Sequence, residues 1–109
     1  MTVTRKRLVG PTLLSNAAAT IYTVPASTLT TLQHLHFSNN TGSDATLSLS
    51  IGADAAGTEL FKSFNIPANT VYDYYPQRGY LNAAEVVQAF SGTSNAINVT
   101  IWGLEETLG

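Results

Sequence analysis

The stretch IYTVPASTLTTLQHLHF, from Ile21 to Phe37, decides the fold predicted for this chain. It holds two runs typical of β-strands, 21–24 and 29–37, separated by a Pro-Ala-Ser turn signal at 25–27. Because side chains alternate along a strand, the second run divides into two faces. One face carries Leu29, Thr31, Gln33, Leu35 and Phe37, and the other carries Thr30, Leu32, His34 and His36. The stretch predicts two strands joined by a tight connection, with Leu35 and Phe37 on an inward face.

Two later stretches alternate in the same way. In ATLSLSIG, residues 45–52, apolar residues alternate with hydroxyl residues. One face of the predicted strand is therefore apolar, and the outward face carries only hydroxyl side chains. The hydroxyl face consists of Thr46, Ser48 and Ser50. In the last strand, 96–104, the core face is predicted to be Ile97, Val99 and Ile101, and the outward face Asn98, Thr100 and Trp102.

The segment ELFKSFN, residues 59–65, fits two structures. Leu60, Phe61 and Phe64 have helical spacing, and Phe61 cannot share one face of a regular strand with the other two. Seven residues are short for a helix, however, and Pro67 follows soon after. The length therefore favours a strand.

The remaining segments complete an all-β pattern. Turn residues recur every 8–12 positions between short strand-like runs, and the crossover helices of a parallel α/β sheet are missing. Pro11 places the run 8–14 at a sheet edge or in an irregular segment, because proline cannot donate to a central ladder. The sequence predicts a single antiparallel β-sandwich or jelly-roll-like domain of about seven to eight strands over 8–105. A basic N-terminal arm, 1–7, would precede it, and a tail, 106–109, would follow.

Composition narrows the function. Only 11% of the 109 residues are charged, against ~25% in an ordinary soluble domain, and the net charge is −2. No stripe of basic residues is present, so we do not expect nucleic-acid binding. No apolar run is long enough to span a membrane, and no signal core follows the N-terminus, so we do not expect a membrane partner. Cysteine is absent, which excludes disulfides and thiolate chemistry. A weakly charged surface of this kind favours a protein that is covered by neighbours in an assembly.

A metal site is only weakly indicated. His34 and His36 are two positions apart on a strand, so their side chains project to one side. No carboxylate follows until Asp44, and the chain has no third histidine. The sequence shows no motif for a serine nucleophile, for a phosphate-binding loop or for a pair of catalytic carboxylates. We therefore predict no catalytic residues and no cofactor.

The most function-like stretch is rich in tyrosine. Four tyrosines lie within residues 72–80, close to Asp73 and Arg78. Tyrosine side chains are rigid and amphipathic, and they are common in protein interfaces. A plainer alternative is that two of the tyrosines fill the core. A third interpretation is that the segment forms a sugar-binding platform. The candidate contact residues are Tyr72, Asp73, Tyr74, Tyr75, Arg78 and Tyr80, with Arg5, Lys6 and Arg7 of the basic arm.

Several short motifs resemble those of small jelly-roll or β-sandwich structural proteins of tailed bacteriophages. They are YTVPA at 22–26, NNTG at 39–42, IPAN at 66–69 and the closing strand at 97–104. The resemblance covers about 12–105 and implies a virion protein made in the host bacterial cytoplasm. It favours a head decoration protein that binds the major capsid protein as a homo-oligomer, weakly as a trimer. Alternatives are a neck or minor tail component, a carbohydrate-binding adhesin, or a cupin-like metalloenzyme that uses the histidine pair.

Overall fold

The computed structural model describes residues 2–52, 57–76 and 80–107, and every regular element in these ranges is a β-strand. The strands are β1 (Thr2–Leu13), β2 (Ala19–Thr23), β3 (Thr28–Asn39), β4 (Ala45–Ile51), β5 (Glu59–Ile66), β6 (Thr70–Tyr74), β7 (Tyr80–Leu81), β8 (Val86–Ser91) and β9 (Ile97–Thr107). The described ranges contain no helix that could cross a membrane. The all-β prediction is confirmed, with nine strands in place of seven or eight.

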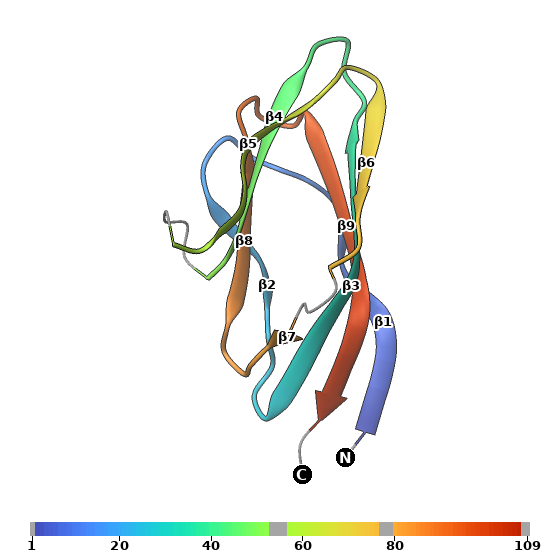
Figure 1. Ribbon diagram of the computed structural model, residues 1–109, viewed down its shortest axis with the longest axis vertical. Helices are drawn as coiled ribbons and strands as arrows, with labels where there is room; N and C mark the ends of the chain where they lie inside the picture. Colours follow the sequence, from blue (N-terminus) through green and yellow to red (C-terminus); the bar gives the residue numbers. More distant parts are fainter. Residues whose placement is uncertain (1, 53–56, 77–79, 108–109) are drawn as a thin grey trace.

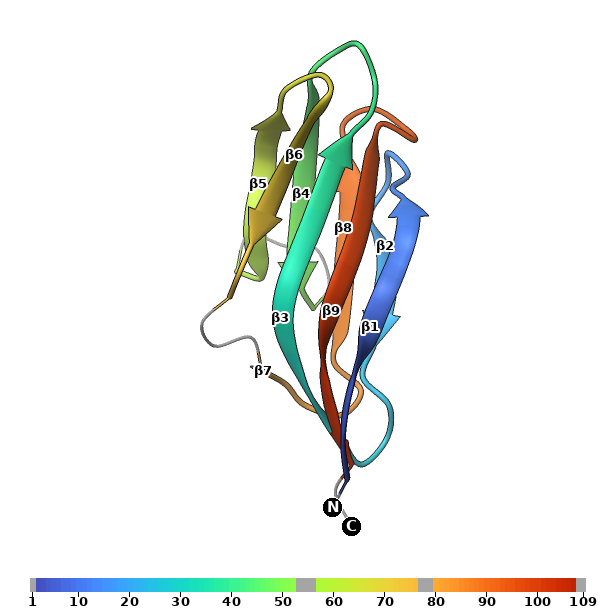
Figure 2. The same cartoon turned by 90° about the vertical axis from the view of Figure 1, so that its right-hand side faces the viewer.

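Two antiparallel sheets form a sandwich. One has the order β1-β9-β3-β6, with β7 also paired to β3, and the other has the order β2-β8-β4-β5. Figure 1 shows the two layers edge-on, and Figure 2 shows the five-stranded sheet facing the viewer. Because the chain repeatedly changes sheet, neighbours in a sheet are mostly distant in sequence, as in the pairing of β1 with β9.

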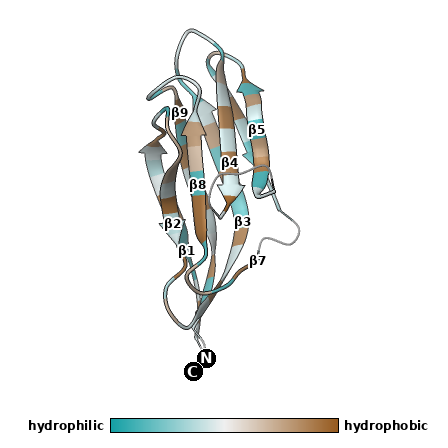
Figure 3. Cartoon of the chain, turned by 90° about the vertical axis from the view of Figure 1, so that its left-hand side faces the viewer, coloured by the Kyte–Doolittle hydropathy of each residue, from teal (hydrophilic) through white to brown (hydrophobic). Residues whose placement is uncertain are grey.

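The core lies between the two sheets. Leu35, Phe37, Leu47, Val99 and Ile101 are all completely or almost completely buried there. Figure 3 views the four-stranded sheet from its own side, where hydrophobic positions alternate with hydrophilic ones along β4 and β8. The predicted inward face of β9 is confirmed, since Ile97, Val99 and Ile101 are fully buried and Trp102 is exposed.

A β-bulge changes the face pattern of β3. Leu32 lies opposite Gly103 and His34 lies opposite Trp102, so Gln33 is an extra residue in the ladder. Before the bulge Thr30 and Leu32 are buried, and after it Leu35 and Phe37 are buried. The single alternation expected over 29–37 is therefore wrong before the bulge and right after it.

A second irregularity explains the ambiguous segment 59–65. It is strand β5, as its length suggested, and its register with β4 shifts around Ser63, which has a positive φ of 48°. The shift lets Phe61 and Phe64, three residues apart, both pack against the core, while Leu60 is 40% exposed.

The hydroxyl face expected on β4 is largely buried. β4 is flanked by β8 and β5, and Ser48 and Ser50 have almost no exposed surface. The Ser48 hydroxyl accepts the Ser63 N–H at 3.0 Å, and the Ser50 hydroxyl donates to the Gly52 carbonyl at 3.0 Å. These hydroxyls are satisfied within the chain, so the expected hydroxyl-rich outer surface is wrong at these two positions.

The expected domain boundaries are corrected at both ends. Residues 2–7 form the first half of β1 and pair with 102–107, where a separate arm was expected. Glu106 and Thr107 likewise belong to β9 and not to a tail. The strand was missed because its polar residues show no apolar alternation; its regular contacts come from backbone pairing with β9.

The edge position expected for the run containing Pro11 is confirmed, since β1 ends the sheet order.

Candidate functional site

The outer face of the five-stranded sheet gathers residues from four strands. We use "outer face" for the side of this sheet that points away from the core. Arg7 of β1 lies opposite Trp102 of β9, which lies opposite His34 of β3, and His36 lies opposite Asp73 of β6. Side chains directly opposite one another share a face of the sheet. The two candidate groups found in the sequence, the histidine pair and the tyrosine-rich segment, therefore meet on one surface.

His34, His36 and Asp73 form a compact cluster. His34 Nε2 lies 2.8 Å from Asp73 Oδ1, and His36 Nδ1 lies 2.6 Å from the same oxygen. The three side chains are each about one-third exposed. Hydrogen bonds from His36, and then from His34, hold the pKa of Asp73 below its usual value. Asp73 is therefore a carboxylate at neutral pH.

Two aromatic rings hold the His34 imidazole. The Tyr75 ring, just after β6, stacks on it with centroids 4.4 Å apart and planes 13° apart. The Trp102 ring, from β9 on the other side of β3, stacks on it at 5.0 Å and 22°. The imidazole is thus fixed between two flat neighbours and has little rotational freedom left.

The tyrosine-rich segment is split by the alternation of β6. Tyr72 and Tyr74 point inward and pack against Phe61, with ring centroids 6.0 Å and 5.2 Å away. Tyr75 and Tyr80 are 65% and 64% exposed. Two of the four tyrosines thus pack against the core, as the plainer alternative predicted, and two remain on the surface. Arg78 lies outside the described residues.

The basic residues near the N-terminus are divided in the same way. Arg5 and Arg7 lie opposite Leu104 and Trp102 and so belong to the outer face. Lys6 points to the other side of the strand, where its Nζ lies 3.1 Å from Glu105 Oε1. Lys6 is consequently engaged within the chain.

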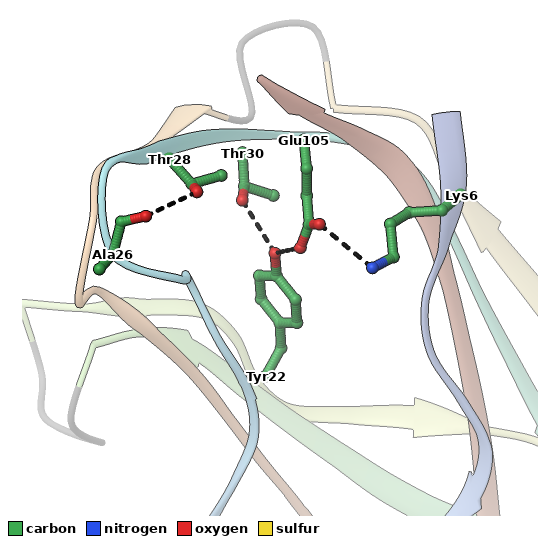
Figure 4. Close-up of polar contacts among 6 residues, drawn as sticks. All are labelled: Lys6, Tyr22, Ala26, Thr28, Thr30 and Glu105. Carbon is green, nitrogen blue, oxygen red and sulfur yellow. Dashed lines mark hydrogen bonds and ion pairs between the residues drawn. The ribbon is translucent and has the colours of Figure 1, made fainter. Parts of the chain in front are cut away.

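Lys6 belongs to a polar network that joins the two sheets (Figure 4). The Tyr22 hydroxyl, from the four-stranded sheet, donates a hydrogen bond to Glu105 of the five-stranded sheet. The same hydroxyl lies 2.9 Å from the Thr30 hydroxyl. Burial and the bond to Glu105 raise the pKa of Tyr22 to about 12. Burial alone would raise the pKa of Glu105, but hydrogen bonds from Tyr22 and Lys6 outweigh it and leave that pKa below its usual value.

These shifts predict a loss of stability in alkali. Folded Tyr22 keeps its proton up to about pH 12, whereas an unfolded tyrosine loses it near 10.0. Between these values the folded state binds more protons, so the free energy of unfolding falls as pH rises. Urea unfolding should show that the stability advantage of the wild type over Tyr22→Phe shrinks between pH 10 and 12. An advantage that stays constant over this range would contradict the prediction. At the acid end, the contribution of Glu105 is lost as pH falls through its lowered pKa.

The sequence did not reveal the partners of these side chains. The sequence associates Asp73 with the tyrosine-rich segment, yet its side chain contacts the two histidines, 37 and 39 positions earlier. Trp102 was predicted to point outward, but its stacking on His34 depends on the register of β9 with β3. The Tyr22–Glu105 bond joins residues 83 positions apart. No local pattern signals contacts over such separations.

Comparison with known proteins shows the fold. No family model matches the sequence, and no curated protein matches it. Among solved structures, the chain is similar to a protein of Bacillus endospore appendages, described as a novel family of disulfide-linked pili. The two share 14% identity over 99% of this chain and 90% of that one, with a TM-score of 0.59. The Tobacco streak virus coat protein is also similar, at 14% identity over 98% and 86% of the chains, with a TM-score of 0.48. The first similarity shows a shared fold.

Proposed function

We propose that this chain is a structural protein without enzymatic activity that assembles with copies of itself through the outer face of the five-stranded sheet. The observation that carries the proposal is the exposure of three aromatic side chains there. Tyr75 and Trp102 stack on His34 of this face, and Tyr80 lies opposite Thr31, in the same row as Leu104 and Arg5. Tyr75 is 65%, Tyr80 64% and Trp102 39% exposed. Tyrosine and tryptophan are enriched in protein interfaces because they bury a large area and lose few rotatable bonds.

The charge of the chain supports self-association. With 11% charged residues and a net charge of −2, copies of the chain repel one another only weakly. The outer face also ends at the exposed edge of β1, and such an edge is commonly covered in an assembly. A symmetric homo-oligomer would cover the aromatic residues and the edge together.

The similar endospore appendage protein is described as forming disulfide-linked pili. This chain has no cysteine, so copies of it cannot be linked in that way. We therefore expect noncovalent contacts to hold an assembly of this chain, with the exposed aromatic residues as the main candidates for the contact surface.

Within this class we favour a head decoration protein of a tailed bacteriophage, located in the virion and bound to the major capsid protein. The sequence motifs at 22–26, 39–42 and 66–69 support this choice. A trimer is the favoured oligomer. Many weak contacts repeated over a capsid lattice would act together, so no single contact needs to be strong. A neck or minor tail component is the alternative, and its position in the particle distinguishes it.

The proposal predicts the behaviour of a surface variant. Size exclusion with light scattering should give a defined small oligomer for the wild type. Tyr75→Ser combined with Tyr80→Ser should give a monomer, because both exposed rings are removed from the interface. Circular dichroism should show that the variant remains folded, since neither side chain belongs to the core.

Leu60→Ser is the matched control, because Leu60 is 40% exposed but lies on the other sheet. It should leave the oligomer intact. A monomeric wild type, or a double variant that stays oligomeric, would contradict self-assembly. Co-sedimentation with undecorated phage capsids then tests the decoration role, and binding to glycan arrays by the monomer would favour an adhesin.

A further inference from the structure

We propose that His34, His36 and Asp73 form a binding site for a divalent transition-metal ion, with zinc as the expected occupant. The described residues bring two imidazole nitrogens and one carboxylate oxygen to a common point, and these three atoms all lie within 4.8 Å of one another. Two histidines with one carboxylate are the ligand set of many three-ligand zinc sites. The proposal does not depend on self-assembly, because all three ligands come from one chain.

Both nitrogen-to-oxygen separations are close to those a metal requires, and the two nitrogens lie no more than 4.8 Å apart. Zinc holds nitrogen and oxygen ligands at roughly 2.0–2.1 Å, so neighbouring ligand atoms of a tetrahedral site lie roughly 3.3 Å apart. The two nitrogen-to-Oδ1 distances, 2.8 Å and 2.6 Å, need to open by less than about 1 Å. Asp73 is on the exposed side of β6, and a small rotation of its side chain supplies that change.

The chemistry of the three groups allows a cation to replace the hydrogen bonds. Each imidazole nitrogen that now faces Asp73 can present a lone pair, once the single N–H of the neutral ring moves to its other nitrogen. An aspartate carboxylate ordinarily carries a negative charge at neutral pH, and both of its oxygens can accept a cation. A single metal ion placed among the three atoms would therefore replace both hydrogen bonds to Asp73.

The stacked rings give the site a fixed geometry. His34 lies between the Tyr75 and Trp102 rings, and His36 and Asp73 are held opposite each other by the pairing of β3 with β6. Ligands held in place before binding lose less conformational entropy when the metal arrives. In the single chain, the partial exposure of all three side chains leaves coordination positions open toward solvent.

The chain carries its own reporter for this site. It has one tryptophan, Trp102, whose ring lies 5.0 Å from that of His34. A paramagnetic ion such as Cu²⁺ or Co²⁺ bound at the cluster should quench the emission of Trp102. Competition by Zn²⁺ should restore the emission, because zinc is not paramagnetic.

The test uses the full chain purified without a histidine tag. Equilibrium dialysis against zinc chloride should give about one zinc ion per chain, and Co²⁺ should quench Trp102 in a saturable titration. His36→Ala and Asp73→Asn should each weaken zinc binding at least about tenfold, because each removes one of three ligands.

Glu106→Gln is the matched control. Glu106 lies on the same outer face near its end, opposite Val3 and Leu29, and removing its charge should leave zinc binding unchanged. Less than about 0.2 zinc per wild-type chain would overturn the proposal, as would equal binding by the wild type and Asp73→Asn. Circular dichroism identifies an unfolded variant, and the wild-type stoichiometry decides the question even if a variant fails to fold.

Discussion

Gly103→Ala is expected to destabilise the protein by about 3 kcal/mol or more, near the upper limit for adding one methyl group to a packed interior. Gly103 lies in β9 opposite Leu32, next to the bulge of β3. A Cβ atom at this position would lie 2.1 Å from the backbone oxygen of Thr31 and 2.9 Å from Leu8 Cδ1. The leucine end can move, but the Thr31 carbonyl is part of the central ladder and cannot move without disturbing its pairing with β9.

The cost is large relative to the total stability. A chain of this length is stabilised by about 5–15 kcal/mol, so a loss of 3 kcal/mol should lower the melting temperature by roughly 10–20 °C. Thermal unfolding followed by circular dichroism measures this directly. Gly42→Ala is the control, because a Cβ atom there meets nothing within 4 Å, and its effect should stay within about 0.5 kcal/mol. Equal melting temperatures for the two variants would show that the close approach at Gly103 is relieved without cost.

The regular strands could be predicted from the sequence because their alternation is local. In β9 the apolar residues Ile97, Val99 and Ile101 occupy every second position, and all three are buried as expected. The bulges could not be predicted. Ser63 adopts a positive φ although it is not glycine, and Gln33 is an ordinary strand residue. Each bulge is fixed by how a strand fits its neighbours, which is a property of the folded sheet.

The candidate site was predictable only in part for a related reason. The spacing of His34 and His36 fixes that both project to one side of β3, and this follows from the sequence alone. That Asp73 completes the cluster depends on the pairing of β3 with β6, which the sequence does not specify. Residues far apart in the sequence meet in this cluster, whereas the adjacent basic residues 5–7 are separated by the fold. They were expected to form one arm, but alternation along β1 separates Lys6 from Arg5 and Arg7.

The bulge in β3 links the core to the site. It reverses the faces of the strand, so that His34 and His36 point outward in the same half of β3 where Leu35 and Phe37 point inward. Without the extra residue Gln33, the ladder register that places Trp102 opposite His34 would be shifted by one position. The geometry of the surface cluster therefore depends on core packing directly beneath it.

Phe37→Ala is the prediction with the largest expected effect, a loss of about 3–5 kcal/mol. Among the described residues, Phe37 is the largest fully buried side chain. Its ring meets that of Phe61 edge to face, with centroids 5.8 Å apart. Removing the ring leaves a cavity at the point where β3 of one sheet packs against β5 of the other. The loss includes both the transfer of the ring from water and the unfilled cavity, because the surrounding strands relax only in part.

Urea unfolding measures the loss, with Val71→Ala as the control. Val71 is 54% exposed on the neighbouring strand β6, and its truncation should cost less than about 0.5 kcal/mol. Phe37→Leu should fall between the two, since leucine refills part of the cavity. A Phe37→Ala variant as stable as the wild type would mean that the two sheets close over the missing ring. Because His36 is the adjacent residue of β3, such closure should also move the imidazole and change the emission of Trp102 near it. If the strand instead keeps its position, stability falls while the emission of the folded variant stays that of the wild type.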